Sequence, residues 1–112
     1  MVGYIAVYIH SDSVTRNKAV GLVKLSCKTD FAARSHEFTS FGELVAQRAV
    51  GYDITDYNQL IQEDPSIEQE RLKLERATLK EPIIIEEILI SSLKDKPKLS
   101  AYEQYKSKIV QV

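Results

Sequence analysis

The stretch VGYIAVYIH, residues 2–10, alternates between two kinds of position along its whole length. In an extended chain, alternate side chains point to opposite sides. One side holds Ile5, Val7 and Ile9, and the other holds Tyr4, Ala6, Tyr8 and His10. β-Branched and aromatic residues dominate the stretch, so we expect a β-strand here.

A second alternating stretch, AVGLVKLSC at residues 19–27, follows the polar, turn-rich segment 11–18. Two adjacent strands joined by one loop favour an antiparallel β-hairpin. In the second strand, Val23, Leu25 and Cys27 alternate with Val20, Leu22, Lys24 and Ser26.

One face of this hairpin is expected to be half apolar, whereas a solvated sheet face is normally polar. We assign Tyr4, Tyr8, Val20 and Leu22 to it. Sheets with such faces pack against each other, so the pattern predicts a dimer face and a homodimer.

The period changes to that of a helix after Ser35, which is a good N-cap. The stripe at helical spacing consists of Phe38, Phe41, Leu44, Val45 and Ala49. Gly51 is the expected end of this helix. Residues 53–56 are expected to cap a short second helix, and Asp64-Pro65 to start a third that covers residues 67–79.

Residues 82–93, PIIIEEILISSL, fit two structures. Their β-branched start indicates a strand, but Ile85, Ile88, Leu89 and Leu93 fit a helical stripe. We expect an extended segment at 82–85, a candidate third strand, followed by a helix. A loop at 94–98 and a helix at 100–111 complete a single α+β domain, residues 1–112. Its architecture is an antiparallel hairpin or three-stranded sheet with helices packed on one face.

Composition narrows the class of protein. A net charge of −1 over 112 residues gives no electrostatic reason to expect a nucleic-acid or membrane partner. The start of the chain lacks the features of a secretory signal. Cys27 is the only cysteine, which excludes an intrachain disulfide and is typical of a cytoplasmic protein.

No catalytic constellation is visible. The four glycines are scattered, and His10 and His36 lack metal-ligand spacing, so we expect no cofactor, no metal and no enzyme activity. A nucleophilic pair of Cys27 with His10 is an alternative, but the expected register places them on opposite faces. A buried, inert thiol is favoured for Cys27. The lysines between residues 94 and 108 are interpreted as a solvated surface rather than an RNA contact.

Residues 21–38 carry a compact motif. Its elements are Gly21-Leu22-Val23, Cys27, Thr29-Asp30-Phe31, Ala33-Arg34 and Glu37-Phe38. The motif resembles the bacterial translation elongation factor Ts family, whose pattern is Gly-x-Leu-Val-x-x-x-Cys, then x-Thr-Asp-Phe-Val-Ala-(Arg/Lys). Residues 3–10 are similar to the family's Gly-x-Ile-x-x-Tyr-Ile-His strand, and the resemblance extends over about residues 3–50.

The chain departs from the family pattern in several places. Ala32 replaces a valine, Lys28 replaces an acidic or amide residue, and the loop 11–18 is longer than the family's tight turn. The family's N-terminal ubiquitin-associated-like module has no counterpart ahead of the first strand, and one copy of the core is present. The resemblance is therefore to a shortened, single-core form.

The resemblance implies a guanine-nucleotide exchange factor for the GTPase elongation factor Tu. It implies that Phe31 wedges into the GTPase domain, with Asp30 as a polar anchor and Thr29 shaping the turn. Ala32 and Arg34 belong to the same partner-binding segment, and His10 is the candidate second contact. An ordinary strand-end histidine remains an equal alternative for His10.

Two other functions remain open. One is a module that binds elongation factor Tu without efficient exchange, which the Ala32 change favours. The other is a structural interaction domain with another partner.

Overall fold

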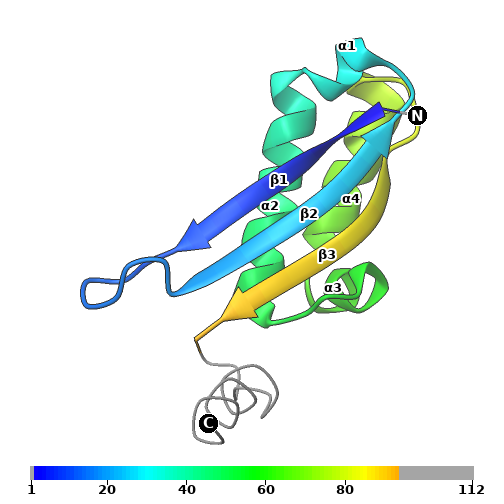
Figure 1. Cartoon of the computed structure of the whole chain (residues 1–112). Coiled ribbons are helices and arrows are strands. Elements are labelled where there is room, and N and C mark those ends of the chain that lie inside the picture. The colour runs from blue at the N-terminus through cyan, green and yellow to red at the C-terminus, as the bar shows by residue number, and fades with distance from the viewer. Residues whose placement is uncertain (1, 94–112) are drawn as a thin grey trace, which may run out of the picture.

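A computed structural model describes residues 2–93 and confirms the α+β class. Three antiparallel strands form one sheet in the order β1-β2-β3. The strands are β1 (Val2–His10), β2 (Ala19–Cys27) and β3 (Ile84–Ser92). The helices lie against one face of this sheet and leave the other face open (Figure 1). No helix within residues 2–93 is long and apolar enough to cross a membrane.

The register of the hairpin decides which side chains face the helices. Ala6 pairs with Val23 and Tyr4 pairs with Leu25. Ala6, Val23 and Leu25 are completely buried, so this side of the sheet is the core side. Ile5, Val7 and Ile9 lie on the open face and remain 58%, 47% and 53% exposed.

The expected dimer face is therefore wrong as a single surface. Tyr4 and Tyr8 are partly buried against the core, whereas Val20 and Leu22 pair with Ile9 and Val7 on the open face. Each strand does alternate as expected. The prediction placed the wrong sides of the two strands on one face. The sequence of either strand alone does not give the register in which the two strands pair across the 11–18 loop.

The helices begin where the N-caps predict. The hydroxyl of Ser35 accepts a hydrogen bond from the Phe38 amide and starts α2 (His36–Tyr52). Asp56 caps α3 (Tyr57–Glu63), and Asp64 caps α4 (Pro65–Lys73), which has proline at its start. The helical stripe on α2 is also confirmed, since Phe38, Phe41, Val45 and Ala49 are buried and Leu44 is half-buried.

The end of α2 corrects the prediction at Gly51. The helix continues through Gly51 to Tyr52, and Asp53 supplies the left-handed cap at φ 58°. Aspartate tolerates this conformation better than most residues with a side chain, so a glycine is not required there.

The third strand corrects the reading of residues 82–93. A strand runs through Ile84–Ser92, so residues 86–92 are extended and not helical. The register shifts between Lys24 and Leu25, so Leu25 pairs with Ile85 and Lys24 pairs with Glu87. This irregularity places Ile85 and Ile88 on the same side although they are three positions apart, which explains why the pattern resembled a helix. The predictions for 94–98 and 100–111 lie outside the described residues.

Candidate partner-binding site

The segment Thr29–Arg34 forms a capped turn at the end of β2. Its one-turn helix, α1 (Asp30–Ala33), is started by Thr29, whose hydroxyl accepts a hydrogen bond of 3.2 Å from the Ala32 amide. The Ala33 amide donates to the Thr29 carbonyl at 3.1 Å, and the Arg34 amide donates to Asp30 at 3.0 Å. The turn therefore has its local hydrogen bonds in place.

Phe31 is presented to solvent by this turn. Its side chain is 87% exposed, whereas Ala32 and Ala33 are 2% and 8% exposed and pack into the core. In one helical turn, neighbouring side chains point in different directions, so seating the two alanines directs Phe31 outward. The core therefore does not require Phe31. A large ring held outward by an ordered backbone is suited to insertion into a partner.

The other predicted residues of the segment surround Phe31 in different ways. Asp30 and Arg34 are exposed and line a shallow hollow beside Phe31, together with Ser35. Ala32 is buried, so its side chain supports the turn from beneath. The structure thus brings Thr29, Asp30, Phe31 and Arg34 to one surface.

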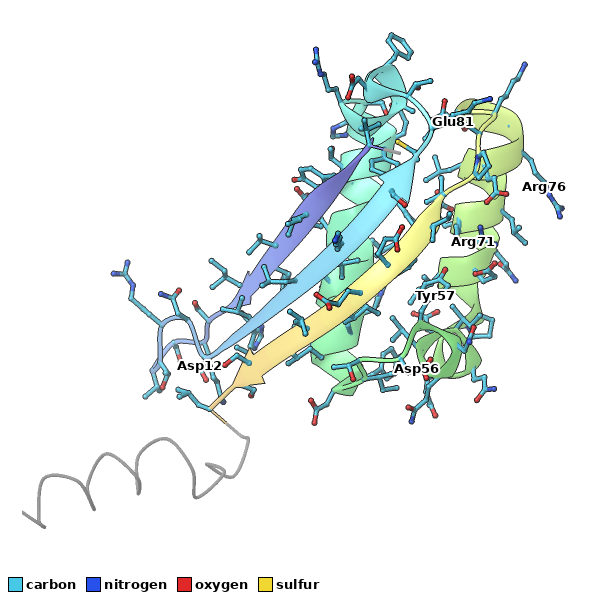
Figure 2. All side chains as sticks on the ribbon, turned by 45° about the vertical axis from the view of Figure 1, so that its right-hand side comes forward. Asp12, Asp56, Tyr57, Arg71, Arg76 and Glu81 are labelled. Atoms are coloured by element: carbon cyan, nitrogen blue, oxygen red, sulfur yellow. The ribbon has the colours of Figure 1, made fainter. Side chains whose placement is uncertain are left out.

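Glu81 holds this turn from a distant part of the sequence, as Figure 2 shows at the α1 end of the molecule. Its Oε1 accepts hydrogen bonds from the amides of Lys28 at 2.8 Å and Thr29 at 2.9 Å. Its Oε2 accepts a bond of 2.9 Å from the Thr29 hydroxyl. Desolvation acts to raise the pKa of Glu81, but these bonds outweigh it and lower the pKa below its usual value.

Sequence reasoning did not find Glu81 as part of the site. Fifty-two residues separate it from Thr29, and a single glutamate before a proline is not a distinctive pattern. The only available signal was its place in LKEPI (79–83), which resembles a Leu-x-Gln-Pro-Phe segment of the elongation factor Ts family. Contact between the two segments depends on the position of β3.

His10 lies at the opposite end of the sheet from Phe31. Nine residues of strand separate the two ends, about 27 Å at the usual rise per residue. The Nδ1 atom of His10 is 3.1 Å from the Tyr8 hydroxyl. Both rings border a hollow of about 460 Å³ whose lining also includes Lys18, Arg48 and Tyr52. The structure does not bring His10 and the Phe31 turn together within one chain.

Cys27 is not placed for nucleophilic catalysis. It shares the core side with His10, contrary to the expected opposite faces, but it pairs with Val2 at the other end of the strand. The thiol is completely buried, and desolvation, followed by the charge of Glu81, raises its pKa. Within residues 2–93, no group of three or more histidine, cysteine or acidic side chains could hold a metal ion.

Comparison with known proteins gives distant and partial similarities to elongation factor Ts proteins. No protein-family model matches the chain. The chain is similar to elongation factor Ts of Borrelia duttonii and of Borrelia recurrentis, at 31% identity over 83 residues in each case. It is also similar to elongation factor Ts of Treponema pallidum, at 38% identity over 45 residues.

These matches cover little of the relatives. The Borrelia matches include 72% of this chain but only 27% of the relative, and the Treponema match includes 40% and 16%. The similarities support an elongation factor Ts-like family for this chain, which spans about a quarter (27%) of the Borrelia proteins.

Proposed function

We propose that this chain is a guanine-nucleotide exchange factor for elongation factor Tu, and that Phe31 is the side chain it inserts into the GTPase domain. The observation that carries the proposal is the 87% exposure of Phe31 on an ordered, capped turn. The similarity to elongation factor Ts over 72% of the chain supports elongation factor Tu as the partner.

The energy available from Phe31 sets a limit on this mechanism. Full burial of a phenylalanine side chain contributes about 2–3 kcal/mol. Accelerating GDP release about a thousandfold requires the barrier to fall by roughly 4 kcal/mol. Phe31 is therefore the main contact but not the whole of it, and a second contact must contribute the rest.

His10 is the candidate second contact, and its position limits the ways in which it and Phe31 can both reach the GTPase. Because His10 and Phe31 lie beyond opposite ends of strands about 27 Å long, they touch either distant parts of one GTPase or the GTPase from two protomers. Asp30 and Arg34 surround Phe31 and supply the polar rim of the first contact.

We also propose that two copies associate through the open sheet face. Its exposed apolar side chains replace the face expected from sequence; they are Ile5, Val7, Ile9, Ile84 and Leu89. The face also carries Lys24 opposite Glu87, so it offers both charges to a second copy. Three strands give a surface of about 400 Å² from ordinary sheet spacings, and a stable partner needs about 800 Å², so the homodimer is weak. Sedimentation that shows only monomer at about 100 μM, where a weak dimer begins to form, contradicts it.

Release of labelled GDP from elongation factor Tu tests the exchange function. The wild-type chain should accelerate release, and Phe31→Ala should lose most of that acceleration. Val14→Ala is the matched control, because Val14 is also an exposed apolar residue, at 90%, but it lies in the loop at the other end of the sheet. Binding without acceleration selects the binding module instead, and no binding selects an unrelated partner.

A further inference from the structure

Glu81 is the most connected side chain at the Phe31 turn. Its three hydrogen bonds satisfy the amides of Lys28 and Thr29 and orient the Thr29 hydroxyl, which caps α1. A helix of four residues has almost no stability of its own, because nucleation fixes several backbone angles for few hydrogen bonds. The order of α1 must therefore come from contacts outside it.

The backbone around Glu81 is shaped to make these contacts. The chain leaves α4 through one π-helical turn, η1 (Leu74–Thr78), and the Leu79 amide donates to the Leu74 carbonyl at 2.8 Å. Lys80 then adopts φ 59°, in the left-handed region that is uncommon for lysine. This reversal directs the next residue, Glu81, towards β2.

A network of charged side chains holds the chain that follows Glu81. Arg71 contacts Glu68 and Glu75, and its guanidinium donates to the Ile83 carbonyl at 3.2 Å. The Ile83 side chain is only 2% exposed. The Tyr57 hydroxyl donates to Glu68 at 2.9 Å and extends the network to α3. In Figure 2, Glu81, Arg71 and Tyr57 lie one below another on the side of the molecule that carries α4.

We propose that Glu81 is a positioning residue for Phe31, which orders the Thr29–Ala33 turn and so fixes the direction in which the ring is presented. The effect of Glu81 on nucleotide exchange rests on the proposed function, whereas its effect on the turn does not. Glu81 acts through the backbone of Lys28 and Thr29 and need not touch the partner itself.

The first test is hydrogen exchange on the free chain, which involves no partner. Glu81→Ala should speed exchange of the Lys28 and Thr29 amides at least tenfold, because both lose their acceptor. Glu81→Gln should restore most of the protection, because the amide oxygen still accepts two bonds. Phe31→Ala should leave these amides protected. Unchanged protection in Glu81→Ala overturns the proposal.

The second test is a double-mutant cycle on GDP release. Glu81→Ala should lower the maximal rate of release about tenfold, or about 1.4 kcal/mol of the barrier, because the ring is no longer fixed in the direction in which it inserts. In the Phe31→Ala background the same substitution should have no further effect, because the ring that it positions is already absent. Glu81→Gln should keep most of the rate. Glu70→Ala is the control, since Glu70 is an exposed acidic residue on α4.

The outcomes separate this proposal from the exchange function. If the wild-type chain does not accelerate GDP release, the exchange function fails, and hydrogen exchange alone decides whether Glu81 orders the turn. If Phe31→Ala is inactive but Glu81→Ala is fully active, the positioning role fails and the exchange function stands. Additive effects of the two substitutions also overturn the positioning role.

Discussion

At each end of the sheet, a carboxylate accepts hydrogen bonds from backbone amides. The two carboxylates differ in how far along the sequence these amides lie from them. At the hairpin loop, Asp12 accepts hydrogen bonds from the amides of Val14 and Thr15, two and three residues away. At the Phe31 end, Glu81 bonds to residues more than fifty positions earlier. Figure 2 shows Asp12 and Glu81 at opposite ends of the strands.

This difference separates local order from order that depends on the whole fold. Most of the bonds that close the loop are local, since the Lys18 side chain donates to Asp12 and the Lys18 backbone amide donates to the His10 carbonyl. The Phe31 turn, by contrast, is bonded by Glu81, which lies in the segment before β3. On the positioning proposal, such a turn is coupled to global folding, so it is ordered in the folded chain and lost together with the fold.

Phe38→Ala should have the largest effect. Phe38 is completely buried at the start of α2, next to α1, and truncating a buried phenylalanine costs about 3–5 kcal/mol. We expect a loss of this size in the free energy of unfolding, measured by urea denaturation. At the other end, Val50→Ala removes less of a partly buried side chain and should cost about 1 kcal/mol. Equal losses would contradict the difference in size and burial between the two side chains.

Thr29→Ala should have an intermediate effect that is specific to the turn. Loss of an N-cap hydroxyl costs about 1 kcal/mol, and here it also removes one bond to Glu81. Urea denaturation gives the stability, and the amide of Ala32 reports loss of the cap by hydrogen exchange. Val14 and Thr15 amides at the loop should not change. A change at both ends would show that the ends are not independent.

The smallest effect is expected on titration with acid. Hydrogen bonds from the Thr15 and Val14 amides, then Lys18, lower the pKa of Asp12 to about 2 from an ordinary value of 3.8. A depressed pKa stabilises the fold above the ordinary value, and this contribution is lost as the pH falls through the folded-state pKa. The loop amides should therefore stay protected until about pH 2. Their exposure at pH 4, with the sheet intact, would contradict this.

Local signals predicted local structure in this chain. Ser35, Asp56 and Asp64 identified their helix starts, because an N-cap acts within three residues. The helical stripe begins only at Phe38, after the Ser35 cap, so Phe31 lies outside it. The hairpin followed from two alternating stretches and the loop between them.

The same local signals did not predict the pairing between segments that are distant in the sequence. The sides of the two strands were matched wrongly because register joins residues up to 25 positions apart, such as Val2 and Cys27. The register shift beside Leu25 gives β3 a spacing of apolar residues that resembles that of a helix. The sequence does not identify Glu81, because this side chain can accept hydrogen bonds from Lys28 and Thr29 only after β3 has paired with β2.

The affinity of the chain for elongation factor Tu with and without GDP tests the exchange function most directly. By linkage, a protein that expels GDP must bind the nucleotide-free GTPase more tightly by the factor with which it weakens GDP binding. We expect the wild-type chain to prefer nucleotide-free elongation factor Tu by about 100-fold, near the upper end of typical coupling. Phe31→Ala should remove most of this preference. Equal wild-type affinity for both forms would contradict the exchange function and show a simple binding module.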